Sequence, residues 1–141
     1  MKKFIYGAIM FFAMQTGFAQ TQDAKTFVDN MGMKANIDGV KQQILPMIDT
    51  AKVADFNKEF DALVNGFVTD FSKLVDENYD AAELKAANQK FAETKEVTVL
   101  EPKDKTTFEQ KAGTLSNEVN MTMQGLVMKY ASAEALQQAE E

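Results

Sequence analysis

Apolar residues recur at spacings of three and four along most of the chain, which is the pattern of helices that each bury one face. The pattern predicts helices over about residues 23–31, 34–49, 52–75, 81–93 and 106–130. The β-prone run Val97–Leu100 has no second strand to pair with, so we expect an extended connector there. The fold class that follows is all-α, a single-domain bundle of about five helices.

Residues that start or stop helices stand near these boundaries. Asp23 is a candidate N-cap of the first helix, and Gly32 can adopt the positive φ that often ends a helix. Pro46 lies inside the second helical pattern, where proline removes a backbone hydrogen bond, so we expect a kink or break near Leu45. Asp80, followed by Glu83, has the spacing of a capping box for the fourth helix.

The third helical pattern is the most regular and predicts the helix that organises the core. Its apolar stripe consists of Val53, Phe56, Phe60, Leu63, Val64, Phe67, Val68, Phe71, Leu74 and Val75. Phenylalanine side chains bury large apolar areas, which favours a central position for this helix. On the second helix we expect a buried stripe of Met33, Ile37, Val40, Ile44, Met47 and Ile48.

The first nineteen residues have the layout of a secretory signal. Lys2 and Lys3 precede a short apolar run, and small and polar residues follow up to Ala19. We expect cleavage after Ala19, which leaves residues 20–141 as one helical domain with its core over about residues 24–130. The apolar run is too short to span a bilayer, and no cysteine follows it for lipid attachment, so we expect no stable membrane anchor. The predicted location is periplasmic or secreted.

The charge balance bears on possible partners. The precursor carries a formal charge of −6, and loss of Lys2 and Lys3 leaves 13 basic against 21 acidic residues, or −8. All basic residues are lysine, and arginine, the residue best suited to bidentate phosphate binding, is absent. An acidic surface repels polyanions, so we expect no nucleic acid partner.

The chain contains no cysteine, histidine or tryptophan. Serine–histidine and cysteine–histidine nucleophiles and imidazole or thiolate zinc sites therefore cannot form from its residues. We expect no cofactor. Any catalysis would depend on carboxylates, lysine, tyrosine or hydroxyl groups, such as paired acids at Asp61 and Asp70 or Glu109 and Glu118. Helical spacing places these acids on outer faces, so solvated surface is the favoured interpretation and the chain is expected not to be an enzyme.

Three segments together resemble the DUF2059 family, exported bacterial domains of unknown function. They are Ile44-Leu45-Pro46-Met47, the phenylalanine stripe from Phe56 to Phe71, and Tyr79-Asp80-Ala81-Ala82-Glu83-Leu84 with Phe91 after it. The resemblance covers roughly residues 24–130. The aromatic, proline- and glycine-containing turn usual in that family is replaced by Ala92-Glu93-Thr94-Lys95-Glu96. The resemblance implies an all-helical, exported protein and no particular activity.

Two motifs bear on metal binding. Asp76, Asn78 and Asp80 alternate like the start of an EF-hand loop, but Ala81 and Ala87 stand where that loop needs glycine and a bidentate carboxylate. Two Met-x-Met pairs offer soft sulfur ligands for Cu(I), but residues two apart point in opposite directions on a helix, so we expect Met123 in the core and Met121 at its flank. We expect no metal site.

The function favoured by the sequence is a non-catalytic interaction module of the cell envelope, with envelope proteins as partners. The alternative is a carrier of a small apolar ligand or lipid; a carboxylate-based hydrolase ranks third. The side chains that could line an apolar ligand site are Phe56, Phe60, Phe67, Phe71, Phe91 and Phe108. A leftover apolar face on the first or last helix would indicate a dimer.

Overall fold

The computed structural model describes residues 21–138, and all of the regular structure in this range is helical. The predicted signal segment and its cleavage site lie outside the described residues. The described elements in chain order are α2 (Gln22–Asn30), α3 (Met33–Ile44), the short 3₁₀ turns Leu45–Met47 and Thr50–Lys52, α4 (Val53–Asn78), α5 (Ala81–Thr94), α6 (Lys105–Tyr130) and α7 (Ala133–Gln138). The predicted all-α class is confirmed, with five longer helices and the short α7.

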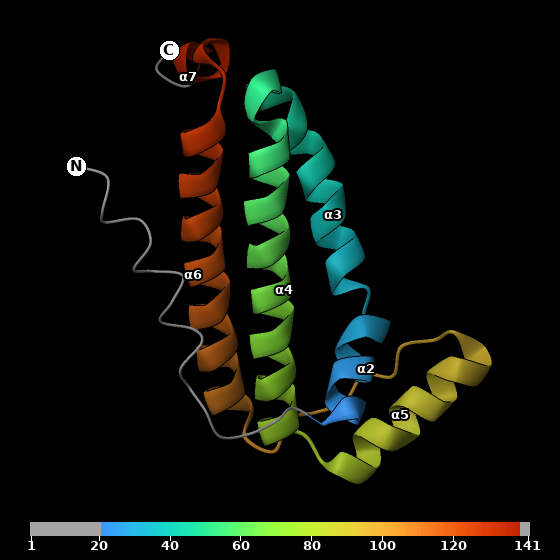
Figure 1. The fold of residues 1–141 in the computed structure, drawn as a ribbon. Helices are drawn as coiled ribbons and strands as arrows, with labels where there is room; N and C mark the ends of the chain where they lie inside the picture. Colours follow the sequence, from blue (N-terminus) through green and yellow to red (C-terminus); the bar gives the residue numbers. More distant parts are fainter. Residues whose placement is uncertain (1–20, 139–141) are drawn as a thin grey trace.

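Two long helices form the body of the molecule. α4 and α6 each contain 26 residues, a length of about 39 Å, and lie side by side (Figure 1). α2 and α3 lie along the other side of α4, and α5 projects beneath α2 (Figure 1). α4 therefore stands between α6 and the pair α2–α3, as its unbroken apolar stripe predicts.

Apolar side chains form one cluster at each end of the α4–α6 pair. The upper cluster, towards α7, contains the buried residues Ile48, Phe56, Phe60, Val64, Leu126 and Tyr130. The lower cluster, around α2 and α5, contains the buried residues Ala24, Phe27, Val28, Val75, Tyr79, Leu84 and Ala87. Val68 of α4 packs against both clusters and connects them.

Most helix ends follow the sequence signals. Gly32 adopts a φ of +69°, and α3 gives way at Ile44 to a 3₁₀ turn that contains Pro46, so the expected break is confirmed. The Asp80 carboxylate accepts hydrogen bonds from the backbone N–H groups of Ala82 and Glu83 and caps α5. The prediction for Asp23 is wrong: the Thr21 hydroxyl accepts from the N–H of Ala24 and caps α2, because α2 begins one residue earlier, at Gln22.

After the break at Pro46, the backbone forms hydrogen bonds with the C-terminal end of α6 and the residues that follow it. Ile48 and Ala131 form an isolated antiparallel bridge, in which the N–H of Asp49 donates to the carbonyl of Tyr130 at 2.9 Å. The N–H of Ser132 donates to the carbonyl of Met47, also at 2.9 Å. Proline cannot continue the helix, and the backbone groups released there are satisfied by α6 instead of by another helical turn.

The predicted buried stripe of the second helix is only partly correct. Ile37 and Ile44 pack against the upper cluster, but no residue of α3 is fully buried. Val40 and Met47 are 44% and 43% exposed. α3 packs against one side of α4 only, so a narrow line of contact replaces the broad buried face that the pattern predicted.

Glycine is required at Gly32 by its backbone conformation, since the site has open space for a β-carbon. We expect Gly32→Ala to lower the free energy of unfolding by about 1 kcal/mol, because alanine is strained at positive φ. Gly39→Ala is the matched control, because Gly39 lies inside α3 and also has open space for a β-carbon. It should raise the free energy of unfolding by about 0.5–1 kcal/mol. Urea unfolding followed by circular dichroism measures both. Equal changes of the same sign would contradict this role of Gly32.

Candidate functional site

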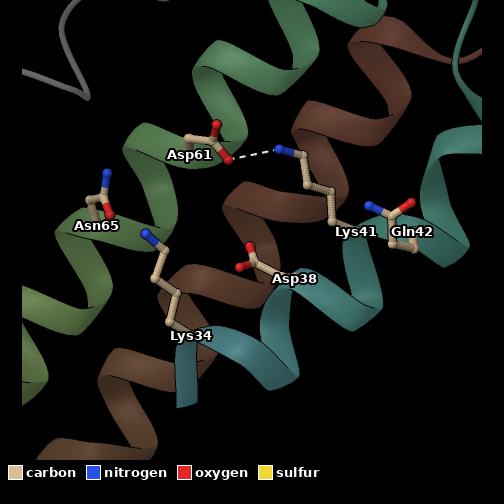
Figure 2. A pocket seen from close by; sticks show the side chains of 6 residues that line it. All are labelled: Lys34, Asp38, Lys41, Gln42, Asp61 and Asn65. Carbon is tan, nitrogen blue, oxygen red and sulfur yellow. Dashed lines mark hydrogen bonds and ion pairs between the residues drawn. The ribbon is translucent and has the colours of Figure 1, made fainter. Parts of the chain in front are cut away.

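A groove between α3 and α4 brings polar side chains of both charges together. Its volume is about 430 Å³, and its lining residues are Lys34, Asp38, Lys41, Gln42, Asp61 and Asn65. The first four come from successive turns of α3 and the last two from α4 (Figure 2). The spacing within each helix places these side chains on the flank that faces the other helix.

One ion pair fixes the two walls of the groove. The Lys41 ammonium lies 2.7 Å from Asp61 Oδ1, and the Lys41 side chain is only 14% exposed (Figure 2). The same ammonium lies 5.3 Å from the centre of the Phe60 ring, within the range of a cation–π interaction. Phe60 is fully buried in the upper cluster, so Lys41 links the groove to that cluster.

The other four lining side chains have no such engagement. Among the described residues, Lys34, Asp38, Gln42 and Asn65 make no side-chain hydrogen bond or ion pair that would occupy them. All four line the same groove as the Lys41–Asp61 pair (Figure 2). The groove therefore offers an ammonium, a carboxylate and two amides to a molecule that enters it, which suits a polar ligand surface with both donors and acceptors.

The six phenylalanines of the predicted apolar site are divided between different places. Phe56 and Phe60 are fully buried in the upper cluster, with ring centres 5.5 Å apart. Phe71 contacts both Phe67 and Phe108, at ring-centre distances of 6.0 and 6.1 Å, near the lower cluster.

Phe91 stands apart on α5, where the Lys95 ammonium lies 5.7 Å from its ring centre. The structure thus brings Phe67, Phe71 and Phe108 together and separates them from Phe56, Phe60 and Phe91.

The candidate acids do not share a site. Asp61 pairs with Lys41, Asp70 lies 3.2 Å from the Lys73 ammonium, and Glu109 lies 3.9 Å from that of Lys105. Within residues 21–138 no group of three or more acidic side chains converges as metal ligands would. Asp61, Asp70 and Glu109 each have a lysine neighbour instead, whereas Glu118 forms no ion pair with another of the described residues.

The residues of the two metal-site hypotheses have local roles. Asn78 is buried and donates to the carbonyl of Leu74 at 2.8 Å, and Asp80 caps α5. Met123 packs against the upper cluster, while Met121 is 74% exposed. The expected division between a core and a flanking methionine on α6 is confirmed.

A second polar cluster joins α4 to the end of α6. Glu59 accepts hydrogen bonds from the Tyr130 hydroxyl at 2.7 Å and from the Lys129 ammonium at 2.7 Å. Burial raises the pKa of Glu59, but the hydrogen bonds from Lys129 and Tyr130 outweigh it and lower the pKa below its ordinary value. The hydrogen bond to Glu59 raises the pKa of Tyr130, so its phenol stays protonated and this cluster works as a tie between helices.

Comparison with protein-family models, with curated proteins and with solved structures finds no match for this chain. Function is therefore inferred from the residues of the site. Of the six groove residues, the sequence singled out Asp61 alone. The signal for the others was the recurrence of Lys34, Asp38 and Lys41 at helical spacing, directly beside the apolar stripe of the second helix.

Proposed function

We propose that this protein is an exported, non-catalytic binding module of the cell envelope, and that it binds a protein partner in the groove between α3 and α4. The observation that carries the proposal is the set of four unengaged polar side chains around the Lys41–Asp61 pair. Small-molecule sites are mostly apolar and bury most of their ligand, whereas protein interfaces carry a polar, hydrated rim. A polar groove of mixed charge resembles the second kind.

Two exposed apolar side chains also lie on this part of the chain. Val40 of α3 and Met47 of the following 3₁₀ turn are both more than two-fifths exposed. Among the described residues no helix has the length and apolar character needed to cross a bilayer. The export proposal rests on the signal-like residues 1–19, and the resemblance to DUF2059, which implies the same location, stays a prediction.

The test places a photoreactive amino acid at Gln42, in the groove, in the full chain with its leader. Gln110, exposed on α6, is the matched control position. We expect a discrete protein adduct from Gln42 and none from Gln110, on a mature chain that begins at Gln20. Absence of an adduct at Gln42, or identical adducts at both positions, would contradict the proposal.

A charge exchange tests whether the groove chemistry is used. Lys34→Glu with Asp38→Lys keeps the net charge and leaves one acid and one base at these two positions, but reverses the field that they create inside the groove. We expect the Gln42 adduct to fall at least about tenfold, because like charges across an interface cost several kcal/mol. The same exchange at Lys105 and Glu109, an exposed pair on α6, is the control and should leave the adduct unchanged.

The carrier of an apolar ligand is the second candidate. It is favoured by the contact between Phe67 and Phe71, which are only half-buried at the lower part of α4. Native mass spectrometry of residues 20–141 separates the two functions. A non-covalent adduct that is lost on denaturation would favour the carrier, and a bare protein would favour the module.

A further inference from the structure

Methionine accounts for much of the apolar surface that the described part of the chain exposes. Of its eight exposed large apolar side chains, four are methionines, namely Met31, Met47, Met121 and Met128. Met121 and Met128 are the most exposed of the four, at 74% and 68%. In a core, methionine fills irregular gaps because its unbranched side chain adapts to the space. At Met121 and Met128 there is no gap to fill, so packing does not explain these two residues.

Met121 and Met128 lie on one face of α6. Residues seven apart are separated by almost two helical turns, so both side chains leave the helix in nearly the same direction. Gly125 lies between them, and a β-carbon at Gly125 would meet no described atom within 4 Å. The other residues of this face are polar and exposed, namely Thr114, Asn117, Glu118 and Gln124. The two thioethers are therefore open to solvent among polar neighbours.

Each Met-x-Met pair of the sequence combines an exposed methionine with a packed one. Met121 is exposed, whereas Met123 is half-buried and packs against the upper cluster. Met31 is exposed, whereas Met33 is half-buried and packs against the lower cluster. The fold thus places one thioether of each pair in solvent and covers the other.

The reactive sulfur is what distinguishes methionine from leucine at an exposed site, because oxidants convert it to the sulfoxide. The chain has no cysteine, histidine or tryptophan, and Tyr79 and Tyr130 are buried. The exposed methionines are therefore the side chains that an oxidant meets first. With hydrogen peroxide, a sulfur lone pair attacks one oxygen and the O–O bond breaks as the S–O bond forms. The proton of the attacked oxygen passes to the leaving hydroxide, which departs as water, so the sulfur loses two electrons and the peroxide gains them.

We propose that Met121 and Met128 form an oxidation site on α6 that consumes peroxides and spares the packed methionines. A sulfoxide oxygen at either position lies in water and disturbs no cluster, so the fold tolerates it. A sulfoxide at Met123 places a polar group against the upper cluster and weakens its packing. Neither exposed methionine lines the groove, and α6 lies on the other side of α4 from α3 (Figure 1). The inference is therefore independent of the proposed function.

Peptide mass spectrometry of the mature chain after brief treatment with hydrogen peroxide measures the order of oxidation. We expect the sulfoxide to form at Met121 and Met128 about tenfold faster or more than at Met123, because susceptibility follows exposure. In urea at a concentration that unfolds the chain, this difference should vanish, since all the methionines are then accessible. Equal rates at Met121 and Met123 in the folded protein, or a difference that persists in urea, would overturn the proposal.

The double variant Met121→Leu with Met128→Leu tests whether the exposed sulfurs protect the core. Leucine keeps the apolar bulk and the high helix propensity but has no sulfur to oxidise. With a limiting amount of peroxide, we expect the sulfoxide at Met123 to rise at least about twofold in this variant, because oxidant that the exposed sulfurs consumed now reaches the packed one. The treated variant should then unfold at lower urea concentration than the treated wild-type chain.

Met123→Leu, added to the double variant, is the control for this loss of stability. It removes the packed sulfur from the upper cluster, so peroxide treatment should no longer lower the urea midpoint. If Met123 is oxidised equally in the double variant and the wild-type chain, the exposed methionines do not protect the core and the proposal fails.

Discussion

Phe60→Ala is expected to lower the free energy of unfolding by about 3–5 kcal/mol, since it removes a large side chain from a site that cannot collapse. Phe60 is fully buried in the upper cluster. The centre of the Phe56 ring lies 5.5 Å from that of Phe60, and the Lys41 ammonium lies over the Phe60 ring. A loss of this size is a large part of the stability of a small domain, which is about 5–15 kcal/mol in total. Urea unfolding followed by circular dichroism at the helix band measures the change.

Phe91→Ala is the matched control for this prediction. Phe91 belongs to neither cluster and is only half-buried on α5, so its removal leaves no enclosed cavity. We expect Phe91→Ala to lower the free energy of unfolding by about 1 kcal/mol, which is well below the loss expected for Phe60→Ala. Equal costs at the two positions would show that the upper cluster is not packed as described.

Leu84→Ala is expected to lower the free energy of unfolding by about 2–5 kcal/mol, because it leaves a cavity in the lower cluster. Leu84 is 1% exposed and is the main apolar residue through which α5 joins that cluster. The polar contacts that accompany it are made by Asn88, whose amide donates to the carbonyl of Asp23 at 2.9 Å and accepts from Asn30. Because α5 packs mainly on α2, weakening this contact should loosen α5 first.

Hydrogen exchange followed by mass spectrometry, together with urea unfolding, tests the Leu84 prediction. Faster exchange is expected across α5 and α2 than across the Phe60 end of α4. Leu136→Ala makes the same chemical change at a residue of α7 that is 42% exposed, and it should change stability by no more than about 0.5 kcal/mol. A Leu84→Ala protein as stable as Leu136→Ala would contradict the role given to α5 packing.

The candidate site is much less visible from the sequence than the helices are. Of its six residues the sequence pattern points only to Asp61, as one of a pair of acids with Asp70. The structure gives Asp61 a different neighbour, Lys41, which is twenty positions away in sequence and belongs to another helix. Periodicity shows which face of a helix is polar, but not which helix lies opposite that face.

The phenylalanine stripe shows the same limit. Its regular spacing predicts one long helix, and α4 extends from Val53 to Asn78 as a single element. The spacing contains no information about the two ends of α6, which take Phe56 and Phe60 into one cluster and Phe71 into contact with another.

By itself, then, the sequence determined the local structure: the helical class, the positive φ of Gly32, the break at Pro46 and the cap at Asp80. These follow from short-range sterics and backbone hydrogen bonding, which act within a few residues. Only the tertiary structure decided that α3 lies on one side of α4 with Val40 exposed, and that Lys41 of α3 pairs with Asp61 of α4. Such features depend on contacts between residues far apart in the chain, whose partners a one-dimensional pattern does not name.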